Sequence, residues 1–317
     1  MRARAASTFV ANYLGLCIAL VVISVLLVIA SPYYLKVANF VNIGNQIAIN
    51  LIIAAGMTVV ITMGGIDLSV GSNVALTGII VALFLRRYGS GIGIVLLGIL
   101  IGLALGVLSG ALNATIINRL GAPPFITTLG TMGVFRGLAL VFSNGRVIYK
   151  MPEGFENAFA GFVFGFPKPL IVAVAIVAIT AFLLNQTTLG RFARIIGGNE
   201  RCADVSGINV NRFKMIVYIY SGLLAAIGGL VLTAMMNAAE PIAGGFYELD
   251  AIAVVVMGGT RLQGGKGTIT GTILGALLLG VARNGLNLMH VPVNFHQLLV
   301  GGIILAAVVS GSRSENA

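Results

Sequence analysis

The sequence predicts an all-α membrane protein: a polytopic helical bundle of about ten transmembrane helices, with eight to ten as the range. Composition carries most of this prediction. The mean hydropathy is +1.04 and only 9% of the 317 residues are charged, whereas about a quarter are charged in an average soluble domain. The apolar runs are also long and do not alternate in polarity, as the strands of a membrane barrel would. Helices are then the structure that satisfies the backbone hydrogen bonds inside lipid.

The length of the chain leaves room for about ten spans of roughly 20 residues each. We therefore expect residues 1–317 to form a single transmembrane domain. The span expected at 249–257 is short, unless the glycine-rich segment after it also lies within the membrane. The expected spans are 9–30, 43–63, 70–85, 92–117, 125–142, 170–184, 215–235, 249–257, 269–282 and 295–309.

Basic residues set the expected orientation. The opening "MRARAAS" carries Arg2 and Arg4, and the most polar stretch of the chain, 186–214, carries five more basic residues. Loops rich in Lys and Arg stay on the cytoplasmic side, so we expect this stretch and both termini there. The pair Arg86 and Arg87 is an exception, because it falls on the outer side. The scattered basic residues indicate this bias rather than a surface for nucleic acid.

Two small-residue faces predict close packing between membrane helices. Glycines recur every four residues in the span 92–117 (Gly98, Gly102, Gly106, Gly110) and again around the span 269–282 (Gly267, Gly271, Gly275). Such faces allow helices to approach closely where lipid provides no hydrophobic drive between them. The two faces also suggest an internal repeat, and the sequence is compatible with both an inverted register and a parallel one.

The sequence contains no recognisable catalytic machinery. "GGTRLQGGKGT" departs from the G-x-x-x-x-G-K-[ST] phosphate loop, because Thr260 stands five residues before Gly265, and Gly267 follows Lys266. No Ser-His-Asp, H-E-x-x-H or paired-carboxylate pattern is present either. The two cysteines lie in different settings and indicate neither a disulfide nor a metal cluster. We expect a protein that is not an enzyme and binds no cofactor or metal itself.

Polar side chains inside otherwise apolar spans are the candidates for a solute pathway, since such groups are costly in a membrane and mark functional sites. "MGGIDLSVGS" contains two of them, and capping of the following helix is their alternative role. The related "MGGTRLQGGKG" carries Arg261 where the first carries Asp67, so an ion pair is expected if the two glycine breaks approach each other. The pathway candidates are Asp67, Ser69, Asn73, Asn113, Arg136 and Asn284.

The polar stretch "RFARIIGGNERCADVSGINVNRFK" predicts a short helix over about 199–206, flanked by glycines at 197, 198 and 207. Two roles fit a short amphipathic helix surrounded by basic residues. It can lie on anionic lipid, or it can dock a cytoplasmic partner.

Three segments together resemble a known family. "GGIDLSVGS", "GGNERCADVSGINVNRFKMIVYIYSG" and "YELDAIAVVVMGGTRLQGGKGTITGTILGALLLGVARNGLNLM" are similar to the membrane permease subunits of bacterial ABC importers for monosaccharides, of the ribose, xylose and arabinose group. The likeness runs from about residue 42 to 309 and is strongest to the ribose-type permeases. It favours partner docking for the polar stretch.

This resemblance implies a permease of the bacterial inner membrane. Two permease copies, identical or closely paralogous, would form the pathway for a monosaccharide. ATP and Mg would bind to a separate cytoplasmic ATP-binding subunit, and a periplasmic binding protein would deliver the sugar. The rival function, a stand-alone secondary transporter or channel, would need an ion-coupling site that the few membrane carboxylates do not suggest.

The resemblance also assigns two further sets of residues. The coupling helix that docks on the ATP-binding subunit corresponds to Gly197, Gly198, Asn199, Glu200, Ala203, Ser206, Gly207 and Ile208. The segment "NAAEPIAGGFYELD" is expected to be an outer loop that meets the binding protein through Glu240, Glu248 and Asp250.

Overall fold

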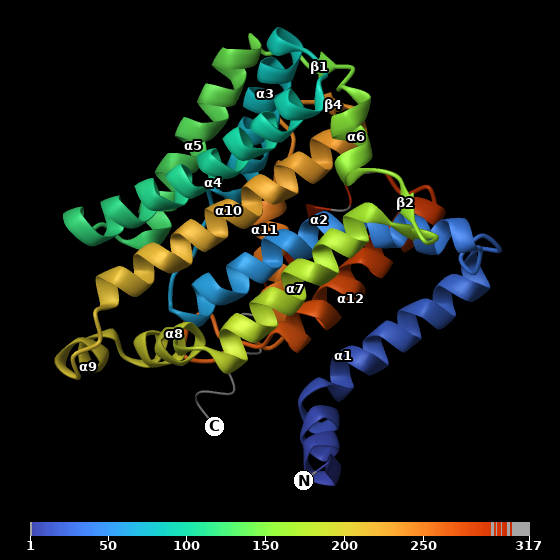
Figure 1. The fold of residues 1–317 in the computed structure, drawn as a ribbon. Helices are drawn as coiled ribbons and strands as arrows, with labels where there is room; N and C mark the ends of the chain where they lie inside the picture. Colours follow the sequence, from blue (N-terminus) through green and yellow to red (C-terminus); the bar gives the residue numbers. More distant parts are fainter. Residues whose placement is uncertain (1, 293–294, 296, 299, 303–304, 306–317) are drawn as a thin grey trace.

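The computed structural model describes residues 2–292, 295, 297–298, 300–302 and 305 (Figure 1). The expected span 295–309 and the C-terminal tail lie largely outside these residues. The helices are α1 (Arg2–Ala30), α2 (Val37–Thr62), α3 (Val70–Tyr88), α4 (Ile92–Leu120), α5 (Pro124–Ser143), α6 (Glu153–Phe159), α7 (Lys168–Gln186), α8 (Thr188–Gly198), α9 (Glu200–Val205), α10 (Val210–Met236), α11 (Tyr247–Met257) and α12 (Ile269–Leu288). The short strands are β1 (Ile148–Tyr149), β2 (Phe162–Val163), β3 (Phe166–Pro167) and β4 (Ala238–Ala239).

The predicted helical membrane bundle is confirmed. Among the described residues, eight helices are long and apolar enough to cross a membrane: α1 to α5, α7, α10 and α12. Helix α11 has 11 residues and is therefore only about 16 Å long at 1.5 Å per residue. Because the hydrocarbon core is about 30 Å thick, α11 does not cross it alone. The expected span 249–257 is thus a half-helix, continued by the glycine-rich loop before α12.

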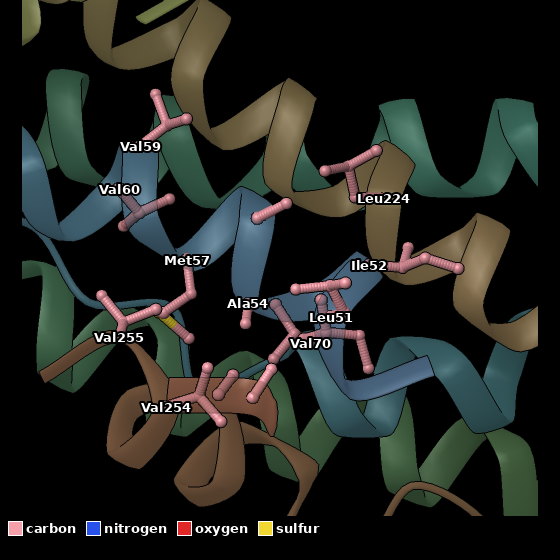
Figure 2. Close-up of a cluster of buried hydrophobic side chains, with 14 of the residues drawn as sticks. Leu51, Ile52, Ala54, Met57, Val59, Val60, Val70, Leu224, Val254 and Val255 are labelled. Atoms are coloured by element: carbon pink, nitrogen blue, oxygen red, sulfur yellow. The ribbon is translucent and has the colours of Figure 1, made fainter. Parts of the chain in front are cut away.

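Helix α2 forms the centre of the bundle. It packs against α7, α10, α11 and α12, and its second half is buried almost continuously. Figure 2 shows side chains of α2 between Leu224 of α10 on one side and Val254 and Val255 of α11 on the other. Helix α1 is more apolar than α2 and lies exposed at the edge (Figure 1), where lipid can surround it. Helix α2 carries several amide side chains, which suits a position inside the bundle.

Close packing at the two glycine faces is also confirmed. A Cβ atom on Gly106 would lie 2.6 Å from the Cβ of Ala226, and one on Gly110 would lie 2.6 Å from the Cα of Ile219, both in α10. Gly275 meets the backbone of Val254 in α11, and Gly271 meets that of Gly258 directly after α11, in the same way. The absence of side chains therefore lets α4 approach α10, and α12 approach α11, at backbone contact.

The two ends of the bundle differ. At one end lie α8 and α9, which are formed by the polar stretch 186–214, and at the other lie α6 and the strand β1 (Figure 1). The second end is closed by an antiparallel pairing of β1 with β4. It is also tied by Asn237, whose side-chain oxygen accepts a hydrogen bond from the backbone N–H of Met151 at 2.7 Å. The segment between α5 and α7 thus contains ordered structure, held to the residues that follow α10.

Candidate functional site

The predicted short helix in the polar stretch is present. Helix α9 begins after Asn199, whose side-chain oxygen accepts from the N–H of Cys202 at 2.9 Å. It ends at Gly207, which has a φ of +83°, the left-handed conformation that favours glycine. The N–H of Ile208 closes this end on the carbonyl of Ala203 at 3.1 Å. Of the predicted flanking glycines, Gly207 follows the helix as expected, whereas Gly197 and Gly198 are the last two residues of α8 and Asn199 caps the start of α9.

Helix α8, which precedes α9, was not predicted. It starts at the capping residue Thr187, which accepts from the N–H of Leu189 at 3.2 Å. Its signal was available in "TLGRFARIIGG", where apolar residues recur at helical spacing between arginines. The buried residues Gly190, Ala193 and Ile196 form the inner face of α8.

The pair α8 and α9, which we call the coupling element (residues 188–205), is tied to both flanking membrane helices. Arg194 donates to the carbonyl of Leu184 in α7 at 2.9 Å. The rings of Phe192 and Phe213 pack edge to face with their centroids 4.8 Å apart, which joins α8 to α10. Glu200 and Lys214 form an ion pair at 2.6 Å between α9 and α10. A displacement of the coupling element therefore moves the ends of two membrane helices.

The coupling element also presents an outward face. Glu200, Arg201 and Asp204 are exposed on it, and so is the apolar side chain of Val205, at 79%. These residues lie beside a surface hollow of about 660 Å³ that reaches Ile208. A mixed charged and apolar surface next to a hollow is suited to contact with another protein.

The end of α8 contacts both glycine breaks of the membrane domain. The N–H of Gly265 donates to the carbonyl of Thr62, at the end of α2, at 2.9 Å. A Cβ on Gly264 would lie 2.8 Å from the carbonyl oxygen of Gly197 and equally close to the amide nitrogen of Gly64. The two breaks, 63–69 and 258–268, therefore meet each other and the coupling element through backbone atoms alone.

The expected ion pair between the two breaks is wrong. Arg261 is exposed, whereas Asp67 is 1% exposed and faces the bundle interior. The carboxylate of Asp67 accepts from the hydroxyl of Ser69 at 2.6 Å and from the hydroxyl of Ser221 in α10 at 2.8 Å. Neighbouring hydroxyl groups therefore satisfy this carboxylate in place of Arg261, one from the same break and one from α10.

Four of the pathway candidates lie close together in one buried cluster. Asn113 donates to Ser69 Oγ at 2.8 Å and accepts from the hydroxyl of Thr131 at 2.7 Å. Asn73 donates to Ser109 Oγ at 2.7 Å. The polar cluster (Asp67, Ser69, Asn73, Ser109, Asn113, Thr131, Ser221) thus joins the first glycine break to α3, α4, α5 and α10.

The alternative capping role is only partly supported. The backbone N–H of Ser69, the residue before α3, donates to Asp67 Oδ1 at 3.1 Å, but the side chain of Ser69 makes no cap bond to α3. Sequence reasoning missed Ser109, Thr131 and Ser221, whose only signal was a hydroxyl among small residues of membrane helices.

The other two pathway candidates lie elsewhere. Asn284 forms a reciprocal pair with Asn39, in which each amide donates to the oxygen of the other, at 2.8 and 3.1 Å. Arg136 donates to the carbonyls of Pro241 and Ala243 at 2.8 and 2.7 Å. It thereby anchors the loop between α10 and α11.

Two of the three docking candidates are not at the surface. The segment expected to be an outer loop is a loop only up to Phe246, and α11 begins at Tyr247. Glu248 and Asp250 are in the first turn of α11 and are buried, at 8% and 2% exposure. Asp250 forms a two-contact ion pair with Arg283 of α12, at 2.5 and 2.7 Å. The pair compensates the charge of Asp250 that has been withdrawn from water, whereas the buried Glu248 Oε2 has no hydrogen-bond partner among the described residues. Only Glu240 stays in the loop, partly exposed.

The bundle and its coupling element define a membrane transport permease, a transporter component rather than an enzyme. The chain belongs to the family described as "Branched-chain amino acid transport system / permease component", which matches residues 39–308.

Curated relatives are similar along nearly the whole chain. It is 44% identical to the ribose import permease of Bacillus subtilis over 96% of this chain and 92% of that one. It is 42% identical to the ribose import permease of Escherichia coli K12, over 94% and 93%. The L-arabinose transport permease of Escherichia coli K12 is 37% identical over 93% and 89%. No solved structure gives a significant match.

Proposed function

We propose that this chain is the transmembrane permease subunit of an ABC importer, and that it forms the pathway by which a ribose-like monosaccharide crosses the bacterial inner membrane. The similarity to ribose permeases along almost the entire length of both chains supports the solute class. The single structural observation that carries the proposal is the coupling element, with its exposed face and its ties to α7 and α10.

In this proposal the chain is not an enzyme and binds no cofactor of its own. ATP and Mg bind to a separate ATP-binding subunit that docks on the coupling element at the cytoplasmic side. The residues that carry the docking are Gly197, Gly198, Asn199, Glu200, Ala203, Ser206, Gly207 and Ile208. A second permease copy completes the pathway, and both chain ends are cytoplasmic. A binding protein delivers the sugar at the opposite end, near Glu240.

The mechanism follows from the contacts at the coupling element. When the ATP-binding subunits close, they displace α8 and α9, and the displacement reaches α7, α10 and both glycine breaks. A shift between inward-open and outward-open states needs such a two-state element whose equilibrium the partner biases. The polar cluster around Asp67 holds the first break to α10, so the break and α10 move together.

Uptake of labelled sugar tests the proposal. The permease, its ATP-binding subunit and its binding protein are expressed in cells that lack sugar permeases of this type, and uptake of ribose, arabinose, allose and leucine is compared. Ribose-like sugars should be taken up, and uptake should stop when the ATP-binding subunit is inactivated. Uptake of leucine alone, or sugar uptake that persists without ATP hydrolysis, would refute the proposal.

A further inference from the structure

Four amides form a stripe along the first half of α2. Asn45 and Gln46 come three and four residues after Asn42, and Asn50 comes four after Gln46, so the four residues lie on one side of the helix. Asn42 and Gln46 are exposed on that face. An amide that faces hydrocarbon leaves its donors and acceptors unsatisfied at considerable cost. This face of α2 therefore meets water or polar groups within the membrane rather than lipid.

The stripe lines a cavity of about 420 Å³, which we call the amide cavity. Its other walls come from the second half of α10, from Tyr247 at the start of α11, and from Arg283 of α12. The volume is within the range of small-molecule sites, about 300–1,000 Å³, and corresponds to roughly fourteen waters. One monosaccharide with part of its hydration shell fits such a space.

The amide cavity lies away from the coupling element. It is formed by the first half of α2 and by the second halves of α10 and α12, whereas α8 contacts the end of α2 and leads into the start of α10 (Figure 1). The cavity is therefore in the half of the bundle that faces the side from which a solute is delivered.

The charge of the lining is balanced. Arg283 is the charged residue among the lining residues that the structure describes, and Asp250 neutralises it through two contacts. Two polar atoms are left over: within the described residues, the buried Asn45 Oδ1 and Arg283 Nε have no hydrogen-bond partner. Those two atoms are shielded from water, so they do not face the open space, and the other amide atoms of the lining are the groups that can bond a solute.

This chemistry selects a neutral, polyhydroxylated solute. Each amide offers both donors and acceptors, which suits hydroxyl groups that also do both. Leu232 and Met235 of α10 and Ile49 of α2 add apolar surface for the C–H face of a sugar ring. An amino acid needs fixed partners for its carboxylate and its ammonium, and the one ion pair here is closed on itself.

We propose that the amide cavity is a binding station for the neutral monosaccharide on its way through the permease, with Asn45 and Asn50 as its principal hydrogen-bonding residues. The inference rests on the proposed importer function and adds the location and the basis of its selectivity. Binding there is weak, because no charge contributes and part of the lining stays hydrated, which suits a pathway that must release its solute.

The test combines uptake with thiol labelling in the assembled importer. Asn45→Leu and Asn50→Leu replace an amide by an apolar side chain of similar size, and each should lower sugar uptake at least tenfold at an unchanged amount of permease in the membrane. The control is Asn157→Leu, on the exposed surface of α6, which should transport normally. Uptake by both cavity variants at the rate of the control would overturn the proposal.

Labelling keeps the proposal testable if a Leu variant fails to insert. In a background with Cys17→Ala and Cys202→Ala, Met235→Cys, which places a thiol in the cavity wall without removing an amide, should react with a small water-soluble thiol reagent in membrane vesicles. Millimolar transported sugar should slow the labelling at least threefold, and leucine should not. Labelling that the sugar leaves unchanged, while the unsubstituted importer still carries it, would refute the cavity assignment. Loss of sugar uptake by the unsubstituted importer would instead refute the importer proposal.

Discussion

Substitution of Gly197 by alanine is predicted to separate the coupling element from the glycine breaks. The new Cβ would lie 2.5 Å from the amide nitrogen of Gly265 and even closer to the carbonyl oxygen of Thr62. Both are backbone atoms, so no side chain can turn away. Overpacking of this kind costs about 1–3 kcal/mol. The hydrogen bond between those two backbone groups, 2.9 Å long, would also open, at roughly 1 kcal/mol.

The expected loss for Gly197→Ala is therefore about 2–4 kcal/mol. Heat-induced unfolding of the purified permease in detergent, at one fixed scan rate, should show a midpoint lower by roughly 5–15 °C. ATP-driven sugar uptake should fall as well, because the break no longer follows α8.

The neighbouring glycine provides a matched control. A Cβ on Gly198 would have nothing within 4 Å, and alanine favours a helix over glycine by up to about 1 kcal/mol. The variant Gly198→Ala should thus unfold at or slightly above the midpoint of the unsubstituted protein. If Gly197→Ala unfolds at the same midpoint as Gly198→Ala, the backbone contact between α8 and the breaks does not exist as described.

Three further predictions use the same two assays. Asp67→Ala leaves buried hydroxyls without their acceptor, at about 1–3 kcal/mol each, so this variant should unfold at least 5 °C below the unsubstituted protein. The isosteric Asp67→Asn should show a smaller fall in the unfolding midpoint. Equal midpoints for the two variants would contradict the polar cluster. Gly110→Ala should destabilise the α4–α10 contact by about 1–3 kcal/mol, while Gly93→Ala, with open space around its Cβ, should leave the unfolding midpoint unchanged. A lower midpoint for Gly93→Ala than for Gly110→Ala would exclude the α4–α10 contact. Reversal of the charge of Glu200 alone should lower uptake several-fold, although its exposed ion pair with Lys214 contributes no more than about 1 kcal/mol to stability. Reversal of the charge of Lys214 in the same protein should restore uptake. If the double variant does not transport, the ion pair has no role in coupling.

Local sequence patterns account for the elements that were predicted correctly. The long apolar runs delimit the membrane helices, because the thickness of the hydrocarbon core sets their length. The glycines at fourfold spacing mark helix faces that meet other helices. Asn199 and Gly207 mark the ends of α9, since capping depends on residues within one turn.

The errors share a physical cause. Each charged residue was assigned a role from its own segment, namely Asp67, Arg261, Glu248 and Asp250. The partner of a buried charge, however, can come from any helix that packs against it. Asp67 bonds to Ser221, 154 positions away in sequence, and Asp250 pairs with Arg283 of the next helix. The stripe of amides along α2 is present in the sequence, but the sequence alone does not show that it lines a cavity, because the opposite wall comes from α10, α11 and α12.

Local patterns in the sequence are enough to predict a polytopic helical membrane protein with a short helix in its main polar loop, and the resemblance of three segments to sugar permeases adds the class of transporter. Hydropathy, glycine spacing and capping are properties of neighbouring residues, and they act the same way in any fold. The contact of the two glycine breaks with α8 through backbone atoms is seen only in the folded structure. The same is true of the neutral, amide-lined cavity beside α2. Those features depend on helices from both halves of the chain arriving at one place, and packing of the whole bundle sets that arrangement.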